Sequence, residues 1–120
     1  MESNVISIRP FIGARNFEQS RNFYRDLGFT EVSLEPKMSL FQNNKAGFYL
    51  QDAYVQDWVD NTMVFMEVED LDQVYCDLLA LNLKSKYSEV KLIPIRVEHW
   101  GRECFLHDPS GILWHFGEFK

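Results

Sequence analysis

The sequence has little cysteine and no long apolar run, and each lack excludes a class of protein. Its two cysteines, Cys76 and Cys104, are too few for a disulfide framework and lack the spacing of metal ligands. We expect both to be buried, reduced thiols. No stretch approaches the roughly 20 apolar residues that cross a bilayer, and the first residues do not resemble a secretion signal. These lacks favour a cytoplasmic protein that does not associate with membranes.

Basic residues are also scarce, because 12 Lys and Arg stand against 18 Asp and Glu and give a net charge of −6. This balance disfavours nucleic acid as a partner, since phosphates bind basic surfaces. It keeps a protein soluble and would also attract a cationic ligand. Glycine-rich phosphate loops and nucleotide-binding fingerprints are absent. Aromatic residues, at 15%, exceed the needs of a small core, and a stacking site for a planar ligand is one use for the excess.

The length of 120 residues fits one domain, which divides into two similar units, about residues 1–58 and 59–120. In the first unit, Val5 to Ile8 predicts a strand that continues or bends away through Ile12. A helix follows, capped by Asn16 and ended by Gly28. Three further strands are predicted at residues 30–34, 39–42 and 47–51, with a hairpin turn at 43–45.

The second unit repeats this order. A strand at residues 62–68 leads to a helix capped by Asp70, and strand-like runs follow at 84–89, 92–98, 103–106 and 112–116. Residues 52–61 join the units, and we expect Tyr54 and Trp58 there to pack on the second unit or to line a ligand site. The predicted fold is α+β, with two β-α-β-β-β modules that form curved mixed sheets.

Two motifs resemble a known family. The helix from Asn16 ends in Leu27-Gly28-Phe29, and the turn Asp108-Pro109-Ser110-Gly111 precedes the last strand. Both resemble the glyoxalase/bleomycin-resistance/dioxygenase (vicinal oxygen chelate) superfamily. The resemblance is strongest to bleomycin-resistance proteins, through Trp100-Gly101-Arg102-Glu103 before the turn and His115-Phe116 after it. Ile112 and Cys104 depart from their pattern. The resemblance implies a homodimer that exchanges its N-terminal strands, with Pro10 bending the exchanged arm.

The resemblance also aligns Arg9, Met63 and His115 with the three ligand positions of metal-dependent members. A guanidinium cannot ligate a divalent metal, a thioether is a weak ligand, and one imidazole cannot hold the ion alone. We therefore expect neither a metal nor another cofactor. Arg9 then either pairs with a carboxylate across the sheet or anchors an anionic ligand. His115 and Arg9 remain the candidate catalytic residues if the chain is an enzyme.

Side chains alternate along a strand, so Met63, Phe65 and Glu67 share one face, and Trp114 lies on the face opposite His115. The ligand-binding residues that we expect are Met38, Tyr49, Gln51, Asp60, Met63, Phe65, Glu67, Trp100, Glu103 and His115. Rings among them would stack on a planar group, and carboxylates would hold a cationic tail. Met38 and Phe65 are alternatively plain core residues.

The predicted function is sequestration of a small molecule, with a bleomycin-type cationic glycopeptide antibiotic as the leading ligand. The resemblance implies that it binds in two grooves at the dimer interface. Two alternatives remain, a metal-independent lyase or isomerase and a regulatory module that binds a metabolite.

Overall fold

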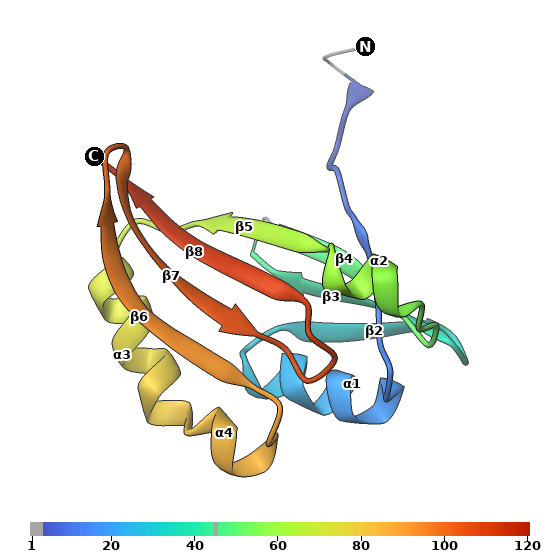
Figure 1. Cartoon of the computed structure of the whole chain (residues 1–120). Coiled ribbons are helices and arrows are strands. Elements are labelled where there is room, and N and C mark those ends of the chain that lie inside the picture. The colour runs from blue at the N-terminus through green and yellow to red at the C-terminus, as the bar shows by residue number, and fades with distance from the viewer. Residues whose placement is uncertain (1–3, 45) are drawn as a thin grey trace.

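The computed structural model describes residues 4–44 and 46–120, which form two four-stranded sheets with the long helices packed on one side (Figure 1). Sheet A has the order β1-β4-β3-β2 and sheet B the order β5-β8-β7-β6. In each sheet the strand that comes first along the chain pairs in parallel with the strand that comes last, β1 with β4 and β5 with β8. The other neighbouring strands are antiparallel. The predicted α+β fold with two mixed sheets is confirmed. The elements are β1 (Phe11–Gly13), α1 (Phe17–Asp26), β2 (Thr30–Glu35), β3 (Met38–Asn43), β4 (Ala46–Gln51), α2 (Gln56–Asp60), β5 (Met63–Glu67), α3 (Leu71–Leu81), α4 (Leu83–Lys86), β6 (Lys91–Glu98), β7 (Gly101–His107) and β8 (Leu113–Phe119).

Both long helices begin at their predicted caps. The side chain of Asn16 accepts a hydrogen bond from the backbone N–H of Gln19 at 3.0 Å, and Asp70 accepts one from Gln73 at 3.1 Å. Each bond satisfies an N–H group that the first helical turn leaves free. Gly28 follows α1 with a φ of 108°, a left-handed conformation that favours glycine.

A buried network ties α1 to the last strand. The hydroxyl of Tyr24 donates to Asp108 at 2.6 Å and accepts from the indole N–H of Trp114 at 2.9 Å. Asp108 also accepts from the backbone N–H groups of its own turn, those of Ser110, Gly111 and Ile112. Trp114 is 2% exposed, which confirms its predicted place in the core. The turn between β7 and β8 is therefore fixed by contacts from both halves of the chain.

Three segments differ from the predictions. No strand forms over Val5 to Ile8, and the first strand begins at Phe11. Residues 84–89 were predicted as a strand, but Leu83–Lys86 is α4, because the buried Leu83 and Tyr87 anchor a helical turn closed by their backbone bond. The connection at 52–61 contains α2, where Trp58 is 73% exposed and does not pack on the second unit.

The two cysteines also differ from each other. Cys104 is buried, and burial raises the pKa of its thiol to about 11. Cys76 is exposed on α3, so the expectation that both are buried is wrong for Cys76. At the predicted hairpin, β3 and β4 pair as far as Asn43 and Ala46, and Asn44 has a φ of 55°. Lys45 lies outside the described residues. No helix in the described ranges is long and apolar enough to cross a membrane.

Candidate functional site

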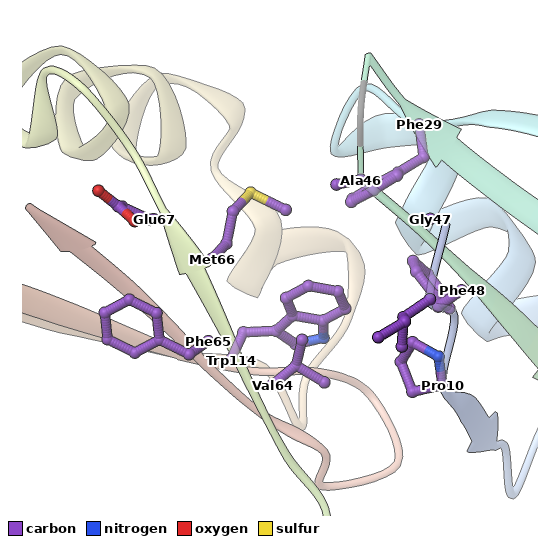
Figure 2. A pocket seen from close by; sticks show the side chains of 11 residues that line it. Pro10, Phe29, Ala46, Gly47, Phe48, Val64, Phe65, Met66, Glu67 and Trp114 are labelled. Carbon is purple, nitrogen blue, oxygen red and sulfur yellow. The ribbon is translucent and has the colours of Figure 1, made fainter. Parts of the chain in front are cut away.

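Sheet B presents one face to α3 and the core and the opposite face to solvent; we call the latter the groove face. On β5, Val64 and Met66 pack toward the core, whereas Phe65 and Glu67 point to the groove face (Figure 2). Phe65 is 45% exposed, which excludes the reading of this residue as plain core. Strand pairing sets His115 beside Phe65, and Phe105 beside His115. These three rings form one row across the groove face.

An aromatic cluster of Phe65, Trp100 and Phe119 extends from this row. The ring of Phe65 lies edge-on to Trp100, with centroids 5.8 Å apart, and the Trp100 and Phe119 centroids are separated by 5.0 Å. Beneath the ring is Gly117, where an added Cβ would overlap the tip of Phe65. The absence of a side chain at Gly117 therefore lets the ring lie close against β8. The partly exposed cluster offers flat apolar surface of the kind that stacks on planar groups.

The imidazole of His115 is held by a carboxylate. Its Nδ1 lies 3.0 Å from Oε1 of Glu103, which is only 8% exposed. The Phe105 ring lies edge-on to the same imidazole, with ring centroids 4.9 Å apart. The guanidinium carbon of Arg96 lies 4.8 Å from the centroid of the Phe105 ring. Because Glu103 already has a partner, it is not a free countercharge for a cationic ligand. Glu67 is exposed on the groove face and forms no ion pair with any described residue.

Three of the predicted ligand-binding residues lie on sheet A instead. Met38 is paired with Gln51 across β3 and β4, and Tyr49 stacks on Phe11 with centroids 4.8 Å apart. The guanidinium of Arg9 donates to the Tyr49 hydroxyl at 3.2 Å and forms no ion pair with a described carboxylate. The other interpretation of Arg9, an anchor for an anionic ligand, stays a prediction.

Asp60, at the end of α2, lies near Gly111, beside the turn between β7 and β8. Among the described residues, no hydrogen bond or aromatic contact joins Met38, Tyr49 and Gln51 on sheet A to the predicted ligand-binding residues on sheet B. One chain by itself therefore does not bring the ten predicted ligand-binding residues into a single site.

Four residues of these surfaces were missed from the sequence, namely Phe11, Arg96, Phe105 and Phe119. Phe105 follows Glu103 by two positions in a predicted strand, so alternation alone places both on one face. Phe119 lies beyond the predicted end of the last strand at Phe116. Phe11 lies in the segment predicted either to continue the first strand or to bend away from it, and no side-chain role was inferred for it. Arg96 follows a register shift in β6 that sequence periodicity does not reveal.

Comparison with known proteins defines the family. The model of the glyoxalase/bleomycin resistance protein/dioxygenase superfamily matches residues 8–116, so the chain belongs to this superfamily. Its structure is similar to that of a bleomycin-binding protein from Streptomyces verticillus complexed with copper(II)-bleomycin, with a TM-score of 0.82, 20% identity and 98% of each chain covered. No match was found among curated proteins.

Further structural neighbours span two kinds of protein. A bleomycin resistance determinant encoded on the transposon Tn5 has a TM-score of 0.79 and 18% identity, over 97% of this chain and 99% of that one. A lactoylglutathione lyase from Agrobacterium tumefaciens has a TM-score of 0.72 and 18% identity, over 96% and 95% of the two chains. At these identities the likeness shows the fold alone.

The residues at the metal positions of the superfamily do not fit a divalent ion. Arg9 is a cation bonded to Tyr49 on sheet A. Met63 and His115 lie on neighbouring strands of sheet B, and Nδ1 of His115 is engaged by Glu103. Within the described ranges, no group of three or more His, Cys, Asp and Glu side chains is placed to hold a metal. A thioether and one imidazole are too few ligands, since protein zinc sites use three or four.

Proposed function

We propose that the chain binds a planar small molecule on the groove face of sheet B without a metal, and that bleomycin-type glycopeptides are its leading ligand class. The observation that carries the proposal is the partly exposed aromatic cluster of Phe65, Trp100 and Phe119. Beside it is the exposed carboxylate of Glu67, which has no ion pair among the described residues. Rings would stack on the planar group, and Glu67 would attract a cationic tail. Binding removes the drug from solution, and no bond is made or broken.

A second copy of the chain completes the site in this proposal. The groove face exposes several large apolar side chains, and contiguous apolar surface of this kind marks interaction sites. They are Met63, Phe65, Ile93 and Phe119, and Phe11 adds another on sheet A. A homodimer would cover this surface and form two grooves by symmetry.

The N-terminal arm, residues 4–10, supports the dimer. It leads away from both sheets (Figure 1), and Ile6 and Ile8 are 95% and 89% exposed. A cavity of about 340 Å³ lies between the arm and β5 (Figure 2), and another of about 410 Å³ lies against the β3–β4 hairpin. The parallel pairing of β1 with β4 covers only Tyr49 to Gln51, so Ala46 to Phe48 face no described strand on that side. An arm from a partner subunit would pair there and bury its isoleucines.

Calorimetric titration with metal-free bleomycin tests the proposed ligand. Trp100→Ala should weaken binding by roughly five- to 150-fold, if stacking contributes as in single-strand nucleic-acid binders. Trp58→Ala is the matched control, because Trp58 is an exposed tryptophan that lies on α2, away from the aromatic cluster. Glu67→Gln should reduce the loss of affinity on adding salt, since exposed charge pairs are screened. No heat and no rise in melting temperature with the wild-type chain at high micromolar drug would refute the antibiotic proposal.

The Glu103–His115 pair supports a second candidate function, that of a metal-independent lyase or isomerase. A carboxylate that holds one imidazole nitrogen leaves the other free to move a proton, as a general base requires. Turnover of lactoylglutathione or related small substrates, lost in His115→Gln and reduced in Glu103→Gln, would establish this function. Arg9, bonded to Tyr49, would then anchor an anionic substrate, and Arg9→Ala should raise KM more than it lowers kcat.

A further inference from the structure

Cationic side chains gather at one end of sheet B, away from the aromatic cluster. Lys91, the first residue of β6, is paired directly with His107, the last residue of β7. Leu92 and Leu106 beside them pack on the core, so alternation sets Lys91 and His107 on the groove face. Arg15, which follows β1, joins them at a cavity of about 200 Å³ against the turn between β7 and β8.

The positive charge of this cluster has no partner in the described part of the chain. Arg15, Lys91 and His107 form no ion pair there, and neither does Glu89, the one acidic side chain that lines the cavity. Burial, with the Lys91 charge adding to it, lowers the pKa of His107 and so disfavours a second positive charge opposite Lys91. A negative group in the cavity would favour the charged imidazole.

The cavity also offers oriented hydrogen-bond donors. Arg15 is fixed by its backbone N–H, which donates to the Ser110 hydroxyl at 2.9 Å, and by one guanidinium nitrogen, 3.4 Å from the Pro109 carbonyl. Its guanidinium lies 5.9 Å from the ring centre of Tyr54, which leaves other N–H groups free. A planar guanidinium with an ammonium and an imidazole is a donor set suited to oxyanions.

We propose that Arg15, Lys91 and His107 form a binding site for a small oxyanion, the phosphate or carboxylate group of a ligand. The site goes beyond the proposed function and does not depend on it, because none of its residues belongs to the aromatic cluster. His107 follows Phe105 by two residues on the same face, a separation of about 7 Å. A ligand held here by an anionic group is therefore able to extend along the groove face to the row of Phe105, His115 and Phe65.

Nuclear magnetic resonance of the His107 imidazole, with inorganic phosphate and acetate as separate probes, tests this proposal. Each bound anion should shift the His107 resonances in a saturable way and raise the pKa of His107. Chloride at equal ionic strength should do neither. A larger response to phosphate than to acetate identifies a phosphate site, and the reverse identifies a carboxylate site.

Lys91→Gln should weaken anion binding by about two- to fivefold, the scale of an exposed charge interaction. Lys84→Gln is the matched control, since Lys84 is exposed on α4 and does not line the cavity. Trp100→Ala should leave phosphate binding unchanged, which separates this proposal from the proposed drug site. Equal affinity in Lys91→Gln and Lys84→Gln, or His107 resonances that respond to phosphate no more than to chloride, would overturn it.

Discussion

Gly117 shows how a missing side chain shapes the candidate site. The ring of Phe65 occupies the space where a Cβ at position 117 would lie, and Gly117 itself is buried in β8. Its φ is not positive, so the backbone accepts alanine and only the ring opposes it. The orientation of Phe65 therefore depends on the neighbouring strand as much as on its own.

We predict that Gly117→Ala destabilises the chain by about 1–3 kcal/mol, the usual cost of overpacking. The same substitution in a Phe65→Ala background should be close to neutral, because the colliding ring is gone. Urea unfolding of the two single variants and the double variant measures this coupling. Equal losses in both backgrounds would show that Phe65 does not lie over Gly117.

Sequence reasoning found residues better than it found their partners. Alternation placed Phe65 on the groove face and Trp114 in the core, because period-two patterns follow directly from strand geometry. It did not find the Glu103–His115 pair, which joins side chains 12 positions apart through the register of β7 and β8. Nor did it find Tyr49, which accepts a hydrogen bond from Arg9 and is 40 positions away.

At the scale of elements, charged side chains attach α1 to sheet A. Glu31 on β2 accepts from Arg21 at 2.7 Å, from Arg25 at 2.5 Å and from the Ser39 hydroxyl at 2.6 Å. Burial by itself would raise the pKa of Glu31, but the hydrogen bonds from Arg21 and Ser39 outweigh it, and the pKa is lowered. This carboxylate therefore favours the folded state.

The sign of this shift predicts an acid effect. An unfolded glutamate titrates near pH 4.3. The stabilisation from Glu31 is present above that pH and is lost as the pH falls through the lower pKa of the folded state. Melting temperatures between pH 7 and pH 3 should therefore fall less steeply for Glu31→Gln than for the wild type. Glu35→Gln is a suitable control, since Glu35 is exposed at the end of β2; identical slopes in both variants would contradict the prediction.

Elements with local signals were predicted, and elements that depend on tertiary contacts were not. Helix ends are marked by local signals that do not depend on the rest of the fold: the capping side chains of Asn16 and Asp70 and the backbone freedom of Gly28. The helix α4 has no such marker. Its Leu83 is buried only because the folded chain brings β6 and α3 beside it. The predicted strand at Val5 to Ile8 has the right residue types, but no strand in residues 4–44 or 46–120 of its own chain pairs with it.

At the scale of the whole molecule, the arm gives the sharpest test of assembly. Ile6 and Ile8 are so exposed in the single chain that replacing them with serine should not destabilise it. If the arm packs on a partner, the Ile6→Ser/Ile8→Ser variant should weaken the dimer, since a fully buried isoleucine contributes about 1.5–3 kcal/mol. Sedimentation equilibrium measures the change, with exposed Leu79→Ser on α3 as the control. A wild-type chain that sediments as a monomer at micromolar concentration would contradict the dimer.

Native mass spectrometry of the wild-type chain with metal-free bleomycin tests the central claim most directly, because one spectrum reports assembly, metal content and ligand count. The account predicts a dimer of the 14.2 kDa chain that carries no metal and takes up two drug molecules at saturation. A dimer of the Trp100→Ala variant should remain largely free of drug under the same conditions. A retained metal ion in each chain, or a wild-type dimer that stays unliganded at high micromolar drug, would contradict the account.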